Sequence, residues 1–520
     1  MPLSKRPHVP FIAALLILLT GLLPCAAQTA APERGTAVID SLALRELDRG
    51  GLGLGRMLQP TTSIDWPIGN DALFALPSML PVQKALDDEF DRYIDRHKSA
   101  SPAETIGVGP SFDLQLFDRA LLVSADTRFV LAGIVNRMDR AFVDADSCGE
   151  IRLIYRLVRI APAGAGDGAL PRLPMTLNMV LKARGRDDDP AITCAELARR
   201  WLATGEAQAR GAELAGWLTS REGALALVGA DHIDRIETDL QIAHVPKSAK
   251  HEFRTDYLLK LFRLDPQRRT FEEARLENQI DRDRIFADAG LKRDFSTWLL
   301  DPKHIGELDR GTILIPEKFL ATGAIAATPA GFAPSNLQPA FGFVQADGYG
   351  NEVFGESEVV AALRKAAAQG ITLENIRSVA GFERRLNDMT CAGCHQTRGI
   401  GGFHFPGVDW TAEKPSTSTI VPASPHFFGD QVRRRDILTA MRDGKQPDFS
   451  RGFSDRPQSR GSTELAGTLY EDGWGAHCYQ QRPRPADNDA SFRLWSCAEG
   501  LSCQPVGNAS RFGMCFVKGR

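Results

Sequence analysis

Two cysteines and a histidine stand within five residues of this 520-residue chain, at 391–395, as Cys391-Ala392-Gly393-Cys394-His395. A run with helical periodicity precedes them over 373–388. With two residues between the cysteines, one helical turn presents both sulfur atoms on one side, and the histidine follows there. We therefore expect a helix that carries two thiols and an imidazole as one site.

The C-x-x-C-H spacing is the one at which haem c is attached, because two thiols bond to its vinyl groups and the histidine reaches the iron. A zinc site would need a second ligand pair nearby, and none follows. A redox dithiol favours a strand-to-helix junction, whereas a helical run stands here. A surface disulfide beside a chance histidine is the remaining alternative. We expect one covalent haem c bound by Cys391, Cys394 and His395, with His395 as an iron ligand.

The second axial ligand is less constrained by the sequence. His404 is the first candidate, because it follows the motif closely in a Gly-rich stretch. His426, Met441 and Met514 are alternatives. For each candidate, the competing interpretation is a purely structural role. Two histidines would lower the reduction potential relative to a His/Met pair, whereas an open position would favour peroxide or small-molecule chemistry. We expect His404 to bind the metal.

The first 27 residues have the three-part pattern of a secretory signal peptide. Lys5 and Arg6 precede an apolar run over 11–23, and Cys25-Ala26-Ala27 then offers small residues for cleavage. The run is too short for a comfortable membrane span, and no later segment is long and apolar enough for one. We expect a periplasmic or secreted protein without an integral membrane span after cleavage. Lipidation of Cys25 is the alternative, although Pro24 stands where a small residue is usual.

Cysteine usage agrees with an oxidising compartment. The chain has nine cysteines, and six remain outside Cys25 and the C-x-x-C-H motif, enough for three disulfides. Cys148 and Cys194 form the simplest pair. The four tail cysteines allow three pairings. Their spacing resembles that of small cysteine-rich extracellular modules, and we expect Cys478–Cys503 with Cys497–Cys515.

Apolar periodicity predicts an α+β fold with a mixed, largely antiparallel sheet, followed by a small helical cytochrome c-like segment and a disulfide-rich module. Strands are expected at 128–135, 151–160, 175–182, 235–245 and 256–262. Helices are expected at 36–49, 81–98, 193–202 (capped by Thr193), 209–228, 281–299, 356–369, 373–388 and 431–442. The predicted divisions are 1–27 (signal peptide), 28–105 (leader region), 106–350 (α+β domain), 351–460 (haem c segment) and 461–520 (cysteine-rich module).

Three stretches carry a resemblance to known families. Gly381-Phe382 ahead of the motif is similar to the start of class I cytochromes c over 381–395. The stretches 134–139 and 148–153, with 254–264, resemble an uncharacterised family of secreted bacterial C-x-x-C-H proteins over most of 105–450. This resemblance implies a shared architecture and supports His404, where the family often has histidine. The residues at 396–399 depart from the family's acidic residue and threonine.

Several function classes lack their signatures. A net charge of −3 indicates neither nucleic-acid nor anionic-membrane binding. The sequence contains no nucleophile elbow, zincin helix, P-loop or kinase motif, and Asp187-Asp188-Asp189 lacks EF-hand spacing. The basic run at 433–435 is expected on a solvated helix face, the alternative being contact with haem propionates or an acidic partner.

We expect an exported monohaem c-type cytochrome-like protein that transfers electrons to an unknown redox partner. The alternatives are a haem-dependent oxidoreductase acting on peroxide or a small molecule, and a secreted binding or surface protein with a structural C-x-x-C-H motif. A two-haem peroxidase would need a second motif, which the chain lacks. The sequence shows no catalytic constellation beyond the expected haem.

Overall fold

The computed structural model of the chain describes residues 35–60, 68–160, 172–184, 192–246, 254–328, 344–345, 353–397, 407–408, 420–421, 430–451, 477–490, 496–497, 501–505 and 511–517. The expected signal peptide, Cys25, His404 and His426 lie outside these residues. Within the described residues no helix is long and apolar enough to cross a membrane.

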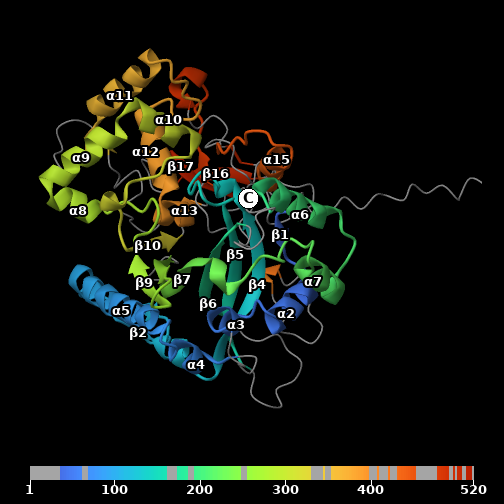
Figure 1. The fold of residues 1–520 in the computed structure, drawn as a ribbon. Helices are drawn as coiled ribbons and strands as arrows, with labels where there is room; N and C mark the ends of the chain where they lie inside the picture. The colour runs from blue at the N-terminus through green and yellow to red at the C-terminus, as the bar shows by residue number, and fades with distance from the viewer. Residues whose placement is uncertain are drawn as a thin grey trace, which may run out of the picture. The chain divides into compact units, whose positions relative to one another are not determined.

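A ten-stranded sheet forms the centre of the fold, and its pairs are antiparallel except β2–β3 (Figure 1). Its strands are β1 (Ala37–Val38), β2 (Ile106–Val108), β3 (Leu114–Leu116), β4 (Thr127–Arg137), β5 (Glu150–Arg159), β6 (Arg172–Lys182), β7 (Ile233–Val245), β8 (Arg254–Asp265), β9 (Thr270–Ala274) and β10 (Gly323–Thr328). The predicted α+β class with a largely antiparallel sheet is confirmed, as are the five predicted strands.

The two faces of the central strands differ in character. Because side chains alternate along a strand, Leu153, Tyr155 and Leu157 of β5 point into a hydrophobic core. Arg152 and Arg156 belong to the opposite face. On that face the register aligns residues of three strands in two rows, Ile154–Asn178–Glu237 and Arg156–Thr176–Asp239. We call this side the polar face; it carries the candidate site.

Helices cover the apolar face and one edge of the sheet. The first core contains residues of α2 (Ser41–Arg49), α3 (Leu54–Leu58), α4 (Asn70–Phe74), α5 (Leu80–Ala100), α6 (Cys194–Glu206) and α7 (Gly211–Thr219). The second core joins β8 and β10 to α8 (Arg282–Ala287), α9 (Ala289–Leu299), α10 (Pro302–Arg310), α11 (Glu356–Ala368), α12 (Val379–Met389) and α13 (Cys391–Thr397). Helix α15 (Gln431–Arg442) packs against α6. The second core includes residues on both sides of position 350, and the domain division there stays a prediction.

Short elements complete the fold. They are the 3-10 helices η1 (Arg119–Val123), η2 (Met138–Arg140), η3 (Ala230–His232), η4 (Glu317–Phe319) and η8 (Pro485–Asp487), the parallel pair β11 (Val344–Gln345) and β12 (Phe354–Gly355), and the antiparallel pair β13 (Gly407–Val408) and β14 (Ile420–Val421). Strands β15 (His477–Tyr479), β16 (Leu501–Pro505) and β17 (Phe512–Val517) form a separate three-stranded sheet in the tail.

The helix expected over 373–388 begins six residues late, at Val379. The carboxylate of Asp309 accepts hydrogen bonds from the backbone N–H groups of Glu374, Asn375 and Ile376, so these residues turn around Asp309 instead. Ser378 then caps the helix by accepting from the N–H of Gly381.

Three other helical predictions were too long. The helix expected over 36–49 begins only at Ser41, because Ala37–Val38 form β1 against β4 and Asp40 then caps the helix by accepting from the N–H of Ala43. The run expected over 281–299 is divided at Asp288, whose carboxylate caps α9 by accepting from Gly290 and Leu291. The run expected over 209–228 ends at Thr219, after which the chain folds back. The N–H of Leu225 donates to the carbonyl of Leu218 at 2.9 Å in this fold-back.

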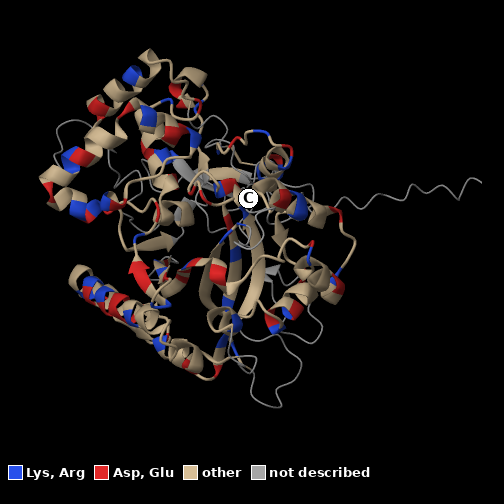
Figure 2. Ribbon diagram, in the orientation of Figure 1, with Lys and Arg blue, Asp and Glu red and all other residues tan. Residues whose placement is uncertain are grey.

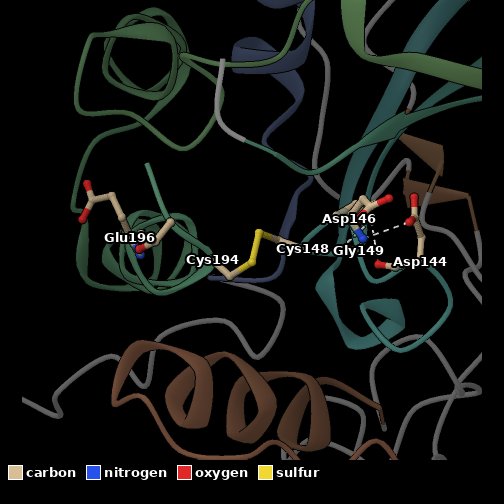
Figure 3. The surroundings of a disulfide bond; sticks show 8 residues. Asp144, Asp146, Cys148, Gly149, Cys194 and Glu196 are labelled. Atoms are coloured by element: carbon tan, nitrogen blue, oxygen red, sulfur yellow. Dashed lines mark hydrogen bonds between the residues drawn. A yellow bond between two sulfur atoms is a disulfide. The ribbon is translucent and has the colours of Figure 1, made fainter. Parts of the chain in front are cut away.

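Disulfides connect elements far apart in sequence. The predicted Cys148–Cys194 bond is confirmed, with a Cα–Cα distance of 5.3 Å. It joins the segment before β5 to the first turn of α6, where Thr193 caps the helix by accepting from the N–H of Glu196 (Figure 3). In the tail the predicted Cys478–Cys503 bond is confirmed. Cys497 is also disulfide-bonded, and its pairing with Cys515 stays a prediction.

Candidate functional site

The C-x-x-C-H motif forms α13, which follows α12 after Thr390 alone. The Thr390 hydroxyl donates to the Asn387 carbonyl at 2.7 Å and accepts from the N–H of Gly393 at 3.0 Å. A Cβ atom added at Gly393 would lie 1.9 Å from the Asn387 carbonyl oxygen. The tight fold of α13 onto the end of α12 therefore requires glycine at the second variable position of the motif.

Two residues after β9 hold α13 from the other side. The amide oxygen of Gln279 accepts from the N–H of Ala392 at 2.9 Å, and the Glu277 carbonyl accepts from the thiol of Cys391 at 3.2 Å. Helix α13 also contacts β10. The motif is thus part of the sheet-centred fold, and its position is set by residues more than 100 positions away in sequence.

His395 lies against the polar face of the sheet. Its Nε2 is 3.3 Å from Oδ2 of Asp239 on β7, and its ring centroid is 4.3 Å from that of Tyr257 on β8. Burial and the nearby Asp239 raise the pKa of Tyr257 to about 12. His395 Nδ1 and Asp239 Oδ1 are buried, and within the described part of the chain neither has a hydrogen-bond partner. One ring nitrogen held by a carboxylate and the other unoccupied is the arrangement of a metal-binding histidine.

The two cysteines of the motif are thiols in this structure. Cys394 is buried, and Cys391 is partly buried. Burial, together with the carboxylates of Glu237 and Glu277, raises the pKa of the Cys391 thiol well above its usual value. Zinc binding and thiol-disulfide exchange both need a thiolate. The raised pKa therefore disfavours the thiolate form at Cys391.

One hollow adjoins Cys391, and a second hollow lies next to the first. The nearer has a volume of about 60 Å³, and Cys391, Arg140, Arg152 and Arg451 are among the residues that line it. The second, about 550 Å³, shares Arg140 and Glu277 with the first. Cofactor-sized ligands occupy about 300–1,000 Å³, so of the two only the larger has the room of a cofactor site. Neither Cys391, Cys394 nor His395 lines the larger hollow. What fits haem c attachment is the donor chemistry of α13, which offers two thiols and an imidazole whose Nδ1 has no partner among the described residues.

Residues that form buried ion pairs line these hollows. Glu150 accepts from Arg152 at 2.7 Å and from Arg235 at 2.7 Å, and Glu237 accepts from both arginines at 3.0 and 2.9 Å. Burial alone would raise the pKa of Glu150, but Arg235, Arg140 and Arg152 hold it well below its usual range. Figure 2 shows acidic and basic positions along the central strands as well as on the helices. The network fixes charged groups of both signs beside Cys391.

The stretches at 134–139 and 148–153 meet at this network. Asn136 accepts from the N–H of Met138 at 2.7 Å, and Arg137 donates to Asp139 at 2.8 Å. Gly149 has φ +98°, and a Cβ atom there would lie 2.6 Å from the Met138 Cα. The two stretches form one close-packed corner at the ends of β4 and β5, next to Glu150 and the ion pairs.

The structure brings together three of the four predicted site residues. Cys391, Cys394 and His395 all lie on α13, whereas His404 lies outside the described residues. Of the other candidates for the second axial position, Met441 packs against the first hydrophobic core. Sequence reasoning missed four residues that contact the motif, namely Asp239, Tyr257, Glu277 and Gln279. They carry no local signal, because their contacts depend on the sheet register.

Comparison of the chain with protein-family models, curated proteins and solved structures finds no match. Within the described residues, one group of three metal-ligating side chains lies together, formed by Cys478, Cys497 and Cys503, and its members are disulfide-bonded. The function of the protein is therefore inferred from the geometry around α13.

Proposed function

We propose that the protein carries one covalent haem c on α13 and transfers electrons outside the cytoplasm. The observation that carries this proposal is the combination at α13 of two thiols with an imidazole whose Nδ1 is buried and unoccupied beside Asp239. The disulfides support a periplasmic or secreted location, because such bonds persist in oxidising compartments. The electron partner is a redox protein that the structure does not define.

The attachment chemistry suits the environment of the thiols. Cys391 and Cys394 would hold the haem through two thioethers, each formed by addition of an S–H bond across a vinyl group, with the sulfur on one carbon and the hydrogen on the other. No oxidant or reductant is consumed. The raised pKa of Cys391 keeps its sulfur neutral, and a neutral thioether is tolerated in the same buried place. When bound, haem c supplies reversible one-electron chemistry at its iron.

The residues around α13 would orient the proximal ligand and tune its charge. Asp239 holds one imidazole nitrogen of His395, which fixes the orientation of the ring. The carboxylate also places negative charge beside the ligand, which favours the oxidised, more positive state. His404 remains the proposed second axial ligand.

Haem staining tests the proposal directly. The full chain is expressed with a cytochrome c maturation system, separated on a denaturing gel and stained, and reduced-minus-oxidised spectra are recorded. We expect a stained band and a sharp α-band that Cys391→Ala/Cys394→Ala removes. Cys148→Ala/Cys194→Ala is the matched control, because it also removes two cysteines but leaves α13 intact. Folded, matured protein without stain would refute the proposal and favour a structural motif in a secreted scaffold.

A second function is haem-dependent oxidation of a small polar molecule. The hollow of about 550 Å³ favours it, because this hollow shares Arg140 and Glu277 with the one that Cys391 lines. The two functions differ in the coordination of the iron. Electron transfer predicts a six-coordinate, low-spin spectrum that His404→Ala converts to high spin. A high-spin spectrum in the unaltered protein, with carbon monoxide binding on reduction, would favour the oxidase or peroxidase instead.

A further inference from the structure

The basic run at the start of α15 is not the solvated helix face that its sequence predicts. Arg434 is only 6% exposed, and its Nε donates to Asp430 at 2.8 Å. Arg433 donates to both oxygens of Asp430, at 2.7 and 3.0 Å. Both guanidinium groups therefore converge on one carboxylate in the interior.

A second carboxylate extends this cluster to the end of β4. Oδ2 of Asp139 accepts from Arg433 at 2.7 Å, from Arg451 at 2.7 Å and from Arg137 at 3.3 Å. Burial alone would raise the pKa of Asp139, but Arg137, Arg433 and Arg451 hold it well below its usual value. The single negative charge of Asp139 is thus shared among three positively charged guanidinium groups.

The cluster has more positive than negative charge. Among its described members, four guanidinium groups (Arg137, Arg433, Arg434 and Arg451) face two carboxylates (Asp139 and Asp430). Burial and the neighbouring Arg433 lower the pKa of Arg451 to about 9, as expected where positive charge is in excess.

Two N–H groups of the cluster have no acceptor. Nη1 of Arg433 and Nη1 of Arg434 are buried, and neither has a hydrogen-bond partner among the described residues. An unsatisfied N–H on a buried charged group is costly, so an incoming acceptor that carries negative charge would relieve both deficits at once.

We propose that Arg433 and Arg434, with Arg451 and Arg137 around them, form a binding site for a doubly charged group of oxyanion or carboxylate chemistry. Arginine suits such groups, because its fork of N–H donors matches two oxygen atoms. The site rests on these contacts and needs no haem.

Two sources can supply this chemistry. One is a free dianion from solution, such as phosphate or sulfate. The other is the pair of propionate carboxylates of the haem, and this source alone rests on the proposed function. Arg451 lines the same hollow as Cys391, which places the cluster beside the attachment site.

The test measures sulfate binding by isothermal titration at constant ionic strength, with chloride as the balancing salt. It uses two forms of the full chain, the haem-free Cys391→Ala/Cys394→Ala protein and the mature haem protein. In the haem-free protein we expect one sulfate site that Arg434→Met weakens at least tenfold. Arg442→Met is the matched control on the same helix, because Arg442 is exposed and paired with Asp443; it should leave binding unchanged. If Arg434→Met does not fold, Arg433→Gln serves, because Arg433 is more exposed.

The two arms distinguish the sources. Sulfate binding to the haem-free protein but not to the mature protein would assign the site to the haem carboxylates. Binding to both would assign it to a free anion. A haem-free protein that binds no sulfate, or binds it equally well after Arg434→Met, would overturn the assignment. Haem staining tests the proposed function separately, so the two failures are distinguishable.

Discussion

Nε2 of His395 lies 3.3 Å from Oδ2 of Asp239, although the two residues are 156 positions apart in sequence. Asp239 belongs to β7, a central strand, so the histidine of the C-x-x-C-H motif is oriented by the sheet and not by a separate small helical domain. The sheet thus holds the imidazole in place and also carries the buried ion pairs beside Cys391.

Replacement of Asp239 by asparagine should raise the reduction potential of the mature protein. The substitution keeps the shape of the side chain but removes a negative charge beside His395, the proposed ligand of the haem iron. Loss of this charge would disfavour the oxidised iron. We expect a rise of about 60 mV, equivalent to about 1.4 kcal/mol for one electron, in a spectroelectrochemical titration. Asp265→Asn, at the far end of β8, is the control and should leave the potential unchanged. An unchanged or lower potential in Asp239→Asn would show that this carboxylate does not act on the iron.

Replacement of Gly393 by alanine should disrupt the site. Its new Cβ would lie 1.9 Å from the Asn387 carbonyl oxygen, so α13 must move away from the end of α12. We expect a loss of about 3 kcal/mol or more in the free energy of unfolding, and weaker haem staining, because the two thiols leave their positions. Chemical denaturation and the stained gel measure these effects.

Gly216→Ala in α7 is the matched control, because nothing lies within 4 Å of its added Cβ. This change should be neutral or stabilise the protein by about 0.5–1 kcal/mol, as alanine is the better helix former. Equal effects of the two substitutions would contradict the proposed tight contact at Gly393.

Loss of the Cys148–Cys194 disulfide should destabilise the fold without preventing haem attachment. The bond closes a loop with a sequence separation of 46, for which the chain-entropy model gives about 4 kcal/mol. Urea unfolding of Cys148→Ala/Cys194→Ala, compared with the unaltered protein, measures this loss. A change below about 1 kcal/mol would indicate that other contacts, such as the Thr193 cap, already hold α6 in place.

Local patterns predicted the strands well, because alternating side chains and β-branched residues act within one segment. The Thr193 cap was also predictable, since its partner is three residues away. The predicted pairing of Cys148 with Cys194 followed from the expected oxidising compartment and the number of cysteines. The strands and the cap are determined by residues that are close together in sequence, and the disulfide was predicted from the number of cysteines.

The missed features depend on long-range register. Asp309 delays the start of α12 by accepting hydrogen bonds from residues 65 to 67 positions later. Arg433 and Arg434 stand in a sequence that is typical of a solvated helix, but α15 turns them toward Asp139 and Asp430. A short segment of sequence around Arg433 and Arg434 does not contain all the carboxylates that pair with them, and it does not show that the two side chains are buried. Their role is therefore visible only in the three-dimensional structure.

Stability should fall steeply in acid, and Asp139 should account for part of the fall. Its pKa in the folded protein is well below the unfolded value of about 4, and the same holds for Glu150. A lowered folded-state pKa means that the stabilisation is present above the unfolded pKa and is lost as the pH falls below it. Between about pH 4 and pH 2, each such carboxylate should contribute a slope of about 1.4 kcal/mol per pH unit.

Asp139→Asn separates this contribution from the others. At pH 7 the variant should lose about 3 kcal/mol, because it leaves the guanidinium groups of Arg137, Arg433 and Arg451 with one charge less to balance them. Below pH 4 its stability should fall less steeply than that of the unaltered protein, by about one proton's slope. Denaturant unfolding at a series of pH values measures both effects, with the exposed Asp95→Asn as control. Parallel pH profiles for Asp139→Asn and the unaltered protein would show that folding does not lower the pKa of Asp139, which would contradict its strong pairing with the three guanidinium groups.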